Sequence, residues 1–132
     1  MKFCRYGPSG EERPAMIDAS GLIRDLSDHV PDLIGGVLDP KSLASLAALD
    51  PDGLPAVEEQ PRLGPPIAGV GKFIGIGLNY ADHAAESGMS LPEEPVVFFK
   101  ATSAIIGSND TVEMPRNSVK TDWEVELGVV IG

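Results

Sequence analysis

Glycine and proline are the residues that most limit what this chain can fold into. Fifteen glycines and twelve prolines are spread along 132 residues, whereas aromatic residues make up only 5%. Proline interrupts helices and central strands and glycine weakens both, so the elements between them are predicted to be short. The pattern excludes a coiled coil and an all-helical bundle. It favours an α+β fold that is mainly β and rich in turns.

Residues 1–68 are predicted to form a small N-terminal α/β domain. It begins with a strand over residues 2–6, and two short runs around a Ser-Gly turn then predict a hairpin over residues 15–26. A helix is predicted to begin at Asp39-Pro40, because aspartate caps helices and proline fits the first helical position. The segment 51–66 contains five prolines and is interpreted as an extended linker, with one or two short strands as the alternative.

Residues 69–132 are predicted to form the start of a second domain. Its expected elements are strands over 72–77, 96–100 and 123–131, a helical segment over 79–87, and a hairpin over 104–114 that turns at residues 108–110. The last strand is the most apolar, and the sequence stops one residue after it. An apolar strand with nothing after it to cover its edge is uncommon, so we expect this domain to be truncated.

Charge and cysteine content exclude several classes of protein. The net charge of −10 leaves no basic surface for nucleic acid and disfavours anionic membranes. A small anionic substrate would need a metal ion or a local cation to hold it. Cys4 is the single cysteine, so no disulfide forms within the chain, and no apolar run approaches the length of a membrane span. With no signal peptide at the N-terminus, the chain is expected to be cytoplasmic.

The sharpest chemical signal is the pair Glu124 and Glu126 in the last predicted strand. Residues two apart on a strand share a face, so the two carboxylates would lie side by side and repel each other. A hard divalent ion such as Mg²⁺ or Mn²⁺ would relieve this repulsion, because it prefers carboxylate oxygens. The alternative is two ordinary glutamates on a solvated strand face.

A second constellation lies on the helical segment after the first strand of this domain. His83 and Glu86 are three residues apart and face the same side of a helix. A carboxylate beside a histidine orients the ring and raises its basicity, which is what a general base requires. The alternative is a surface His–Glu pair. Lys100, which ends an apolar strand, could hold a substrate carboxylate or simply extend into solvent.

These pieces, in this order, resemble the fumarylacetoacetate hydrolase family. The resemblance covers residues 70–132. The segments that carry it are Phe73-Ile74-Gly75-Ile76-Gly77-Leu78-Asn79-Tyr80-Ala81-Asp82-His83, Glu94-Pro95-Val96-Val97-Phe98-Phe99-Lys100, and Trp123-Glu124-Val125-Glu126-Leu127-Gly128-Val129-Val130-Ile131-Gly132. The first part of the chain looks like the small N-terminal domain of a bacterial branch that includes 2,4-diketo-3-deoxy-L-fuconate hydrolases and ureidoglycolate lyases.

The resemblance implies a role for each candidate residue. Glu124 and Glu126 match two ligands of the family's Mg²⁺ or Mn²⁺ ion, and the third, an aspartate, is expected beyond Gly132. His83 and Glu86 match the family's catalytic dyad, in which the histidine activates a water molecule. The reaction implied is hydrolysis of a C–C bond in a 2,4-diketo acid, through a metal-stabilised enolate.

Lys100 matches a lysine near the substrate, although Ala101 stands where many members have proline. Leu78 likewise replaces an arginine found in some members, which leaves the substrate's identity open. The resemblance also implies a mixed β-roll around the metal site and a homodimer. Three alternatives remain: isomerisation, decarboxylation or lyase chemistry within the same family. A further alternative is a non-catalytic role for an incomplete fragment.

Overall fold

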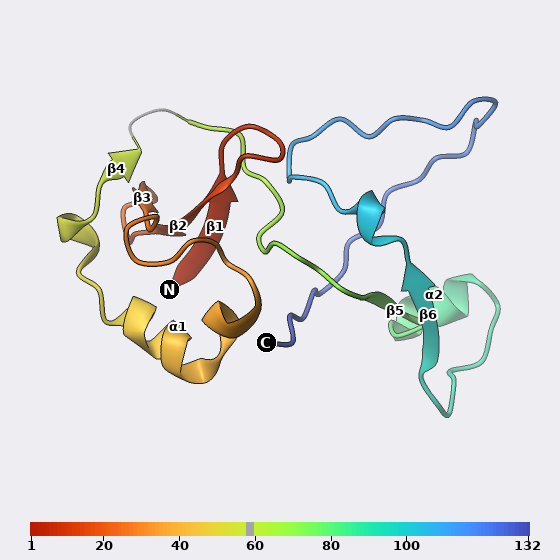
Figure 1. The fold of residues 1–132 in the computed structure, drawn as a ribbon. Helices are drawn as coiled ribbons and strands as arrows, with labels where there is room; N and C mark the ends of the chain where they lie inside the picture. The colour runs from red at the N-terminus through yellow and green to blue at the C-terminus, as the bar shows by residue number, and fades with distance from the viewer. Residues whose placement is uncertain (58–59) are drawn as a thin grey trace. The chain divides into compact units, whose positions relative to one another are not determined.

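The computed structural model describes residues 1–57 and 60–132, and it divides the chain into two compact units. Unit 1 comprises Met1–Gly69 together with Ile106–Gly132, and unit 2 comprises Val70–Ile105. Figure 1 shows the elements of each unit along the chain. The 36 residues of unit 2 separate the two parts of unit 1 in the sequence, but these parts form one compact unit.

The centre of unit 1 is a four-stranded antiparallel sheet in the order β1-β2-β3-β4. The strands are β1 (Lys2–Tyr6), β2 (Arg13–Ile17), β3 (Ile23–Asp25) and β4 (Ala56–Val57). The predicted first strand and the hairpin over residues 15–26 are confirmed. Register places Phe3 opposite Met16 and Cys4 opposite Ala15. Since side chains alternate across a strand, these two pairs lie on opposite faces of the sheet.

Each face of this sheet carries its own apolar cluster. Met16 packs with Leu26, Leu46 and Leu54 on one face, and Cys4 packs with Tyr6 and Ala15 on the other. Cys4 is buried, and this burial raises the pKa of its thiol. The cysteine therefore acts as a small apolar core residue rather than as a reactive thiol.

Helix α1 (Pro40–Ala47) begins where the sequence predicts. The carboxylate of Asp39 accepts hydrogen bonds from the backbone N–H groups of Lys41 (2.8 Å) and Ser42 (3.3 Å), and Pro40 occupies the first helical position. Leu46 anchors the helix in the apolar cluster below the sheet. A short 3₁₀ turn, η1 (Gly35–Leu38), precedes the helix.

The proline-rich stretch 51–66 is more ordered than an extended linker. It contains the 3₁₀ turn η2 (Pro51–Gly53) and strand β4, and Leu63 pairs with Tyr6 at the edge of the sheet. The alternative interpretation, short strands between the prolines, is thus correct for residues 56–57. Residues 58 and 59 of this stretch lie outside the described residues.

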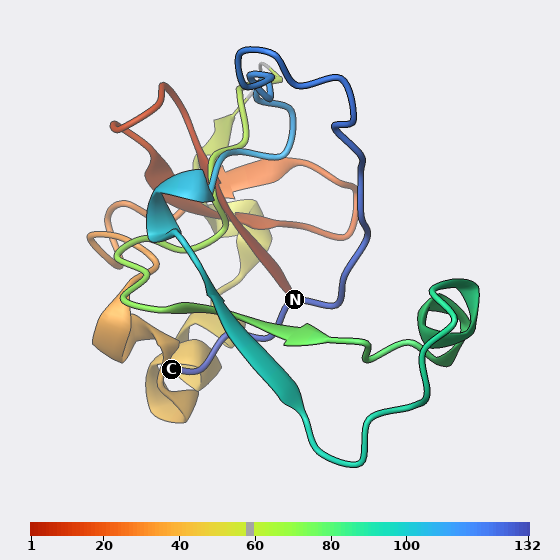
Figure 2. The same ribbon diagram turned by 90° about the vertical axis from the view of Figure 1, so that its right-hand side faces the viewer.

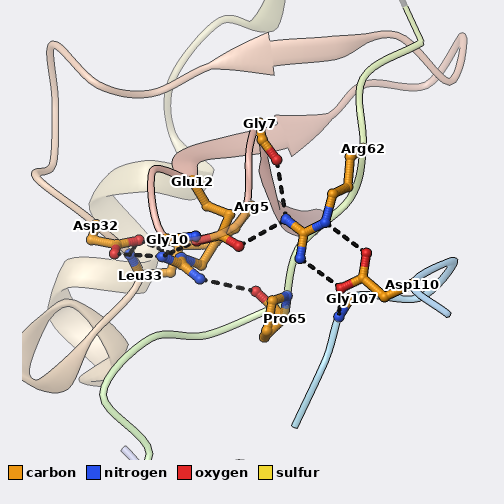
Figure 3. A network of polar contacts seen from close by, with 10 residues as sticks. All are labelled: Arg5, Gly7, Gly10, Glu12, Asp32, Leu33, Arg62, Pro65, Gly107 and Asp110. Carbon is orange, nitrogen blue, oxygen red and sulfur yellow. Dashed lines mark hydrogen bonds and ion pairs between the residues drawn. The ribbon is translucent and has the colours of Figure 1, made fainter. Parts of the chain in front are cut away.

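A ladder of alternating charges, which we call the charge ladder, ties unit 1 together (Figure 3). The guanidinium of Arg5 pairs with Asp32 (2.6 and 2.9 Å) and lies 3.6 Å from Glu12. Arg62 pairs with Glu12 (2.8 Å) and, through two parallel hydrogen bonds of 2.6 Å each, with Asp110. These hydrogen bonds from Arg62 hold the pKa of Asp110 and of Glu12 below their usual range. The carboxylates are therefore charged at neutral pH.

Unit 2 is a two-stranded antiparallel sheet with a short helix between its strands. Strand β5 (Phe73–Gly77) pairs with β6 (Val96–Lys100), and α2 (Ala81–Glu86) follows β5. Figure 2 shows β5 and β6 side by side, with α2 beyond the end of β5. The strands predicted at 72–77 and 96–100 and the helical segment at 79–87 are confirmed. A 3₁₀ turn, η3 (Thr102–Ala104), closes the unit.

Two predicted strand regions are wrong. Residues 104–114 contain the predicted turn, in which the N–H of Asp110 donates to the carbonyl of Gly107 (3.1 Å), but no strands flank it. Residues 123–131 form no strand either, and Trp123 and Leu127 are 82% and 83% exposed. A strand requires a neighbour for its backbone hydrogen bonds, and none of the described strands pairs with these residues.

The expected fold class is confirmed as a small α+β arrangement, mainly β, in open sheets. Within residues 1–57 and 60–132, no helix combines the length and the hydropathy that crossing a bilayer requires.

The buried pair of Tyr6 and Asp25 yields a first prediction. The Tyr6 hydroxyl donates to Asp25, whose other partners are Ser27 and Arg13. Replacing Tyr6 by phenylalanine leaves a buried carboxylate with one donor fewer, which should lower the free energy of unfolding by about 1–3 kcal/mol. Urea unfolding of the chain measures this. Tyr80→Phe is the matched control, because Tyr80 is 43% exposed; equal stability of the two variants would contradict the prediction.

The same pair predicts a loss of stability in alkali. Burial, followed by the hydrogen bond to Asp25 and its negative charge, raises the pKa of Tyr6 from 10.0 to about 12. Between these values the unfolded chain loses the phenolic proton and the folded chain keeps it, so stability falls as pH rises from 10 to 12. Urea midpoints across this range should fall more steeply for the wild type than for Tyr6→Phe. If the urea midpoints of the two proteins fell equally with pH, Tyr6 would not be the source of the alkaline loss of stability.

Candidate active site

The dyad predicted from the sequence, His83 and Glu86, lies on α2. The chain leaves β5 at Gly77 and turns at Leu78, whose φ of 52° lies in the left-handed region. This conformation costs a non-glycine residue about 1–2 kcal/mol. The turn at Leu78 directs the chain away from β5 and into the helix.

Within α2 the dyad has the arrangement that its spacing predicts. His83 Nδ1 lies 4.0 Å from Glu86 Oε2. This is an ion-pair distance, longer than a hydrogen bond, and both side chains are more than half exposed. Ala84 is buried and fixes the opposite side of the helix. Both members of the dyad are thus open to a ligand, and a small side-chain rotation would bring the carboxylate into hydrogen-bond distance of the ring.

Lys100 lies at the opposite end of the two-stranded sheet from α2. It pairs with Phe73 at the start of β5, whereas α2 follows Gly77 at its end. Four steps of about 3.3 Å separate the two ends, which places the backbone of Lys100 about 13 Å from the end that leads into the dyad. The structure therefore brings His83 and Glu86 together, while Lys100 stands apart from them along the strand.

Aromatic rings, rather than carboxylates, hold the ammonium group of Lys100. Its Nζ lies 5.8 Å from the centre of the Phe73 ring and 5.9 Å from that of Phe98, within the range of cation–π attraction. No ion pair of Lys100 is found in the described part of the chain. Its positive charge is therefore available to an anionic group.

Gly75 makes this arrangement possible. It lies directly opposite Phe98, and a Cβ atom at residue 75 would come within 2.4 Å of the aromatic ring. Gly77 extends the same surface, with its own hypothetical Cβ at 3.6 Å from Phe98. The glycines let the ring of Phe98 approach the backbone of β5 closely, and Lys100 lies beside it.

The carboxylates of Glu124 and Glu126 belong to unit 1, in a segment without regular secondary structure, and both residues are exposed. The expectation that a strand places them on one face is therefore wrong in this structure. Among residues 1–57 and 60–132, no three His, Cys, Asp or Glu side chains gather to hold a metal ion. As oxygen donors the two glutamates suit Mg²⁺ or Mn²⁺, but they supply only part of a ligand set.

The structure also has a hollow of about 230 Å³ in unit 1 that contains none of the predicted site residues. It is lined by apolar residues, among them Phe3, Leu33 and Val130. Its lining offers no titratable group, so it is not a candidate for the chemistry.

Sequence reasoning missed the pairing of Arg62 with Asp110 and the conformation of Leu78. Arg62 stands among prolines and Asp110 in a polar turn 48 residues later, so no periodicity or local motif connects them. A leucine in the left-handed region leaves no trace in the sequence, since glycine or asparagine is the usual residue there.

Comparison with known proteins agrees with the motifs of the second half. Residues 72–132 match the sequence model of the family described as "Fumarylacetoacetate (FAA) hydrolase C-terminal". Residues 72–132 are thus similar to the fumarylacetoacetate hydrolase family. This segment holds the dyad, Lys100 and both glutamates.

Several similar curated proteins come from Burkholderia. Proteins named "Putative hydrolase" from Burkholderia cenocepacia (strain HI2424), Burkholderia ambifaria (strain MC40-6) and Burkholderia multivorans (strain ATCC 17616 / 249) are each 65% identical over all 132 residues. The chain covers 47% of each of these proteins. It therefore spans about half the length of the curated relatives it matches.

The packing of Phe98 on Gly75 yields a prediction for the segment that matches this family. In Gly75→Ala the new methyl group should displace the Phe98 ring and destabilise the β5–β6 pair by about 1–2 kcal/mol, as overpacking does. The NMR shifts of the Lys100 side chain should move, because its ring neighbours move, and the β5 amides should exchange faster. Gly71→Ala is the matched control, since a Cβ there meets no atom within 4 Å. Similar spectra for both variants would contradict the packing argument.

Proposed function

We propose that the polypeptide carrying this sequence is a divalent-metal-dependent hydrolase that cleaves a C–C bond of a 2,4-diketo acid of the acylpyruvate type. The observation that carries the proposal is the juxtaposition of His83 and Glu86, 4.0 Å apart and open to solvent, within the segment that matches the fumarylacetoacetate hydrolase family. The hydrolase names of the Burkholderia relatives support the reaction class.

In this proposal the dyad supplies the general base. A side-chain rotation from their 4.0 Å separation would let Glu86 accept a hydrogen bond from Nδ1–H of His83, which leaves Nε2 free to remove a proton from water. The water oxygen then bonds to the C4 carbonyl carbon of the substrate, and the C3–C4 bond breaks with its electrons passing to the pyruvate enolate. Return of a proton to C3 completes a balanced hydrolysis to a carboxylic acid and pyruvate.

In this proposal the other candidate residues bind the metal ion or the substrate and do not transfer protons. Glu124 and Glu126 would provide two ligands for Mg²⁺ or Mn²⁺. When bound, such an ion supplies electrostatic stabilisation for the developing enolate. Lys100, which has aromatic rather than acidic neighbours, is suited to a substrate carboxylate. A local cation of this kind is what an acidic chain with a net charge of −10 needs to retain an anion.

The proposal also includes a homodimer and a cytoplasmic location. The dimer follows from the family resemblance, and the location is proposed from the single cysteine, Cys4, which is free and buried, as suits a reducing compartment. Light scattering of the purified protein tests the dimer.

The test of the proposal is an activity measurement on the protein as its source organism makes it. Acylpyruvates lose ultraviolet absorbance on cleavage, and with Mg²⁺ or Mn²⁺ present His83→Ala and Glu124→Ala should each lower kcat at least a hundredfold, a loss of about 2.7 kcal/mol in transition-state stabilisation. Exposed residues provide the controls: His29→Ala and Glu113→Ala should retain activity.

Product analysis separates the alternatives. Hydrolysis gives two fragments, decarboxylation releases CO₂, isomerisation conserves the mass, and a ureidoglycolate lyase would act on a different substrate. Unchanged activity of Glu124→Ala would overturn the metal assignment. A wild-type protein that cleaves no diketo acid would favour a non-catalytic role.

A further inference from the structure

The charges of unit 2 are separated along its two-stranded sheet. Its carboxylates all belong to the connection that leads from the end of β5 to the start of β6 (Figure 2): Asp82, Glu86, Glu93 and Glu94. Its two lysines, Lys72 and Lys100, lie at the other end, where β5 begins and β6 ends. The sheet is about 13 Å long, and physiological salt screens charges beyond about 8 Å. The carboxylates of unit 2 therefore do little to offset the charge of Lys100.

Two aromatic rings reach the ammonium group of Lys100 from different directions. Phe73 lies directly opposite Lys100 on the neighbouring strand, and Phe98 precedes it by two residues on its own strand. Residues in either relation share a face of the sheet, so all three side chains lie on one face. The ammonium nitrogen lies 5.8 Å from the centre of the Phe73 ring and 5.9 Å from that of Phe98. It is therefore held both across the sheet and along the strand.

The rings attract the charge of Lys100 without using its hydrogen-bond donors. A cation–π contact is made with the negative face of a ring and needs no acceptor atom. Within residues 1–57 and 60–132, the ammonium group makes no ion pair. Its N–H groups are therefore available to an anionic ligand. Ordering a lysine side chain opposes binding, and the rings reduce this cost because they order the side chain in advance.

The ring of Phe98 also extends along the sheet face toward the end that leads to the dyad. A Cβ atom on Gly75 would lie 2.4 Å from this ring, and one on Gly77 would lie 3.6 Å from it. The ring therefore covers β5 between these two glycines, and α2 follows shortly after Gly77. A ligand whose carboxylate contacts Lys100 can thus extend beside an apolar surface in the direction of the dyad.

We propose that Phe73 and Phe98 are positioning residues that make the enzyme selective for substrates with a free carboxylate. This role rests on the proposed function, in which Lys100 binds the carboxylate of a 2,4-diketo acid. By holding the ammonium group in place, the rings increase the affinity for the charged substrate. They add little to the binding of a neutral analogue, such as the methyl ester of the same acid. Because this contribution is to binding, its loss raises KM and leaves kcat nearly unchanged.

NMR of the chain tests the contact between Lys100 and the two rings. Protons above an aromatic ring are shifted upfield, so Phe73→Leu and Phe98→Leu should each move the ε-CH₂ signals of Lys100 downfield. Phe99→Leu is the matched control, because Phe99 lies on the opposite face of the sheet and is 71% exposed. If neither ring variant moved the Lys100 signals, the contact and the positioning role would both be overturned.

Steady-state kinetics of the protein as its source organism makes it tests the selectivity. Phe73→Leu and Phe98→Leu should each raise KM for a 2,4-diketo acid about threefold, the effect expected of one exposed cation–π contact. In both variants kcat for the acid and KM for its methyl ester should not change. Phe73→Tyr, which keeps an aromatic face, should retain the KM of the wild type.

A fluorinated ring separates the charge interaction from packing. Replacing the phenylalanine at position 73 or 98 by 3,4,5-trifluorophenylalanine nearly keeps the shape of the ring but removes negative charge from its face. We expect it to raise KM for the acid as leucine does, whereas the same replacement at position 99 should have no effect. If the fluorinated ring at both positions left KM unchanged, the cation–π basis of the positioning role would be wrong.

The outcomes distinguish this role from the proposed function. If the wild-type protein cleaves a diketo acid and the ring variants keep its KM, the positioning role is overturned and the proposed function stands. Equal rises in KM for the acid and for its ester would show that the rings act only through packing, and would overturn the selectivity. A wild-type protein that cleaves no diketo acid would overturn both proposals.

Discussion

The guanidinium of Arg62 is the constraint on which the arrangement of unit 1 depends. It donates to Gly7 and Glu12 in the turn between β1 and β2 and to Asp110 in a distant turn, and so joins two stretches of the sequence to its own. Through Glu12 the charge ladder continues to Arg5 and Asp32. A unit with a four-stranded sheet and two small apolar clusters has little hydrophobic area to hold an irregular segment in place. Directed, charge-assisted hydrogen bonds serve this purpose instead.

Unit 2 depends on a different constraint, the two glycines of β5, Gly75 and Gly77, which leave space on one face of the strand. A strand that reads Phe-Ile-Gly-Ile-Gly has one face with bulky residues and another on which glycines leave space. The ring of Phe98 fills that space, and the ammonium of Lys100 lies beside it. Glycine content thus affects the candidate site through packing. The glycines that weaken β5 also leave room for the ring of Phe98, beside which the ammonium group of Lys100 lies.

The sequence predicted what depends on local patterns and missed what depends on distant partners. The cap at Asp39, the strands of unit 2 and the spacing of His83 and Glu86 are local, because capping, alternation and helical periodicity act within a few residues. The strand expected at residues 123–131 has the right pattern but no partner among the described strands, and pattern alone does not form a ladder. Arg62 and Asp110 have a partner but no pattern, since nothing in the sequence relates two residues that are 48 positions apart.

The distribution of positive charge bears on how a chain this acidic could hold the anionic substrate that we propose. Arg5, Arg13, Arg24 and Arg62 all pair with carboxylates of unit 1 and are neutralised there. Lysine and arginine differ in the partners that suit them. The planar guanidinium suits paired carboxylates, and the compact ammonium suits an aromatic face. Because Lys100 is held by Phe73 and Phe98, its charge is positioned without being cancelled.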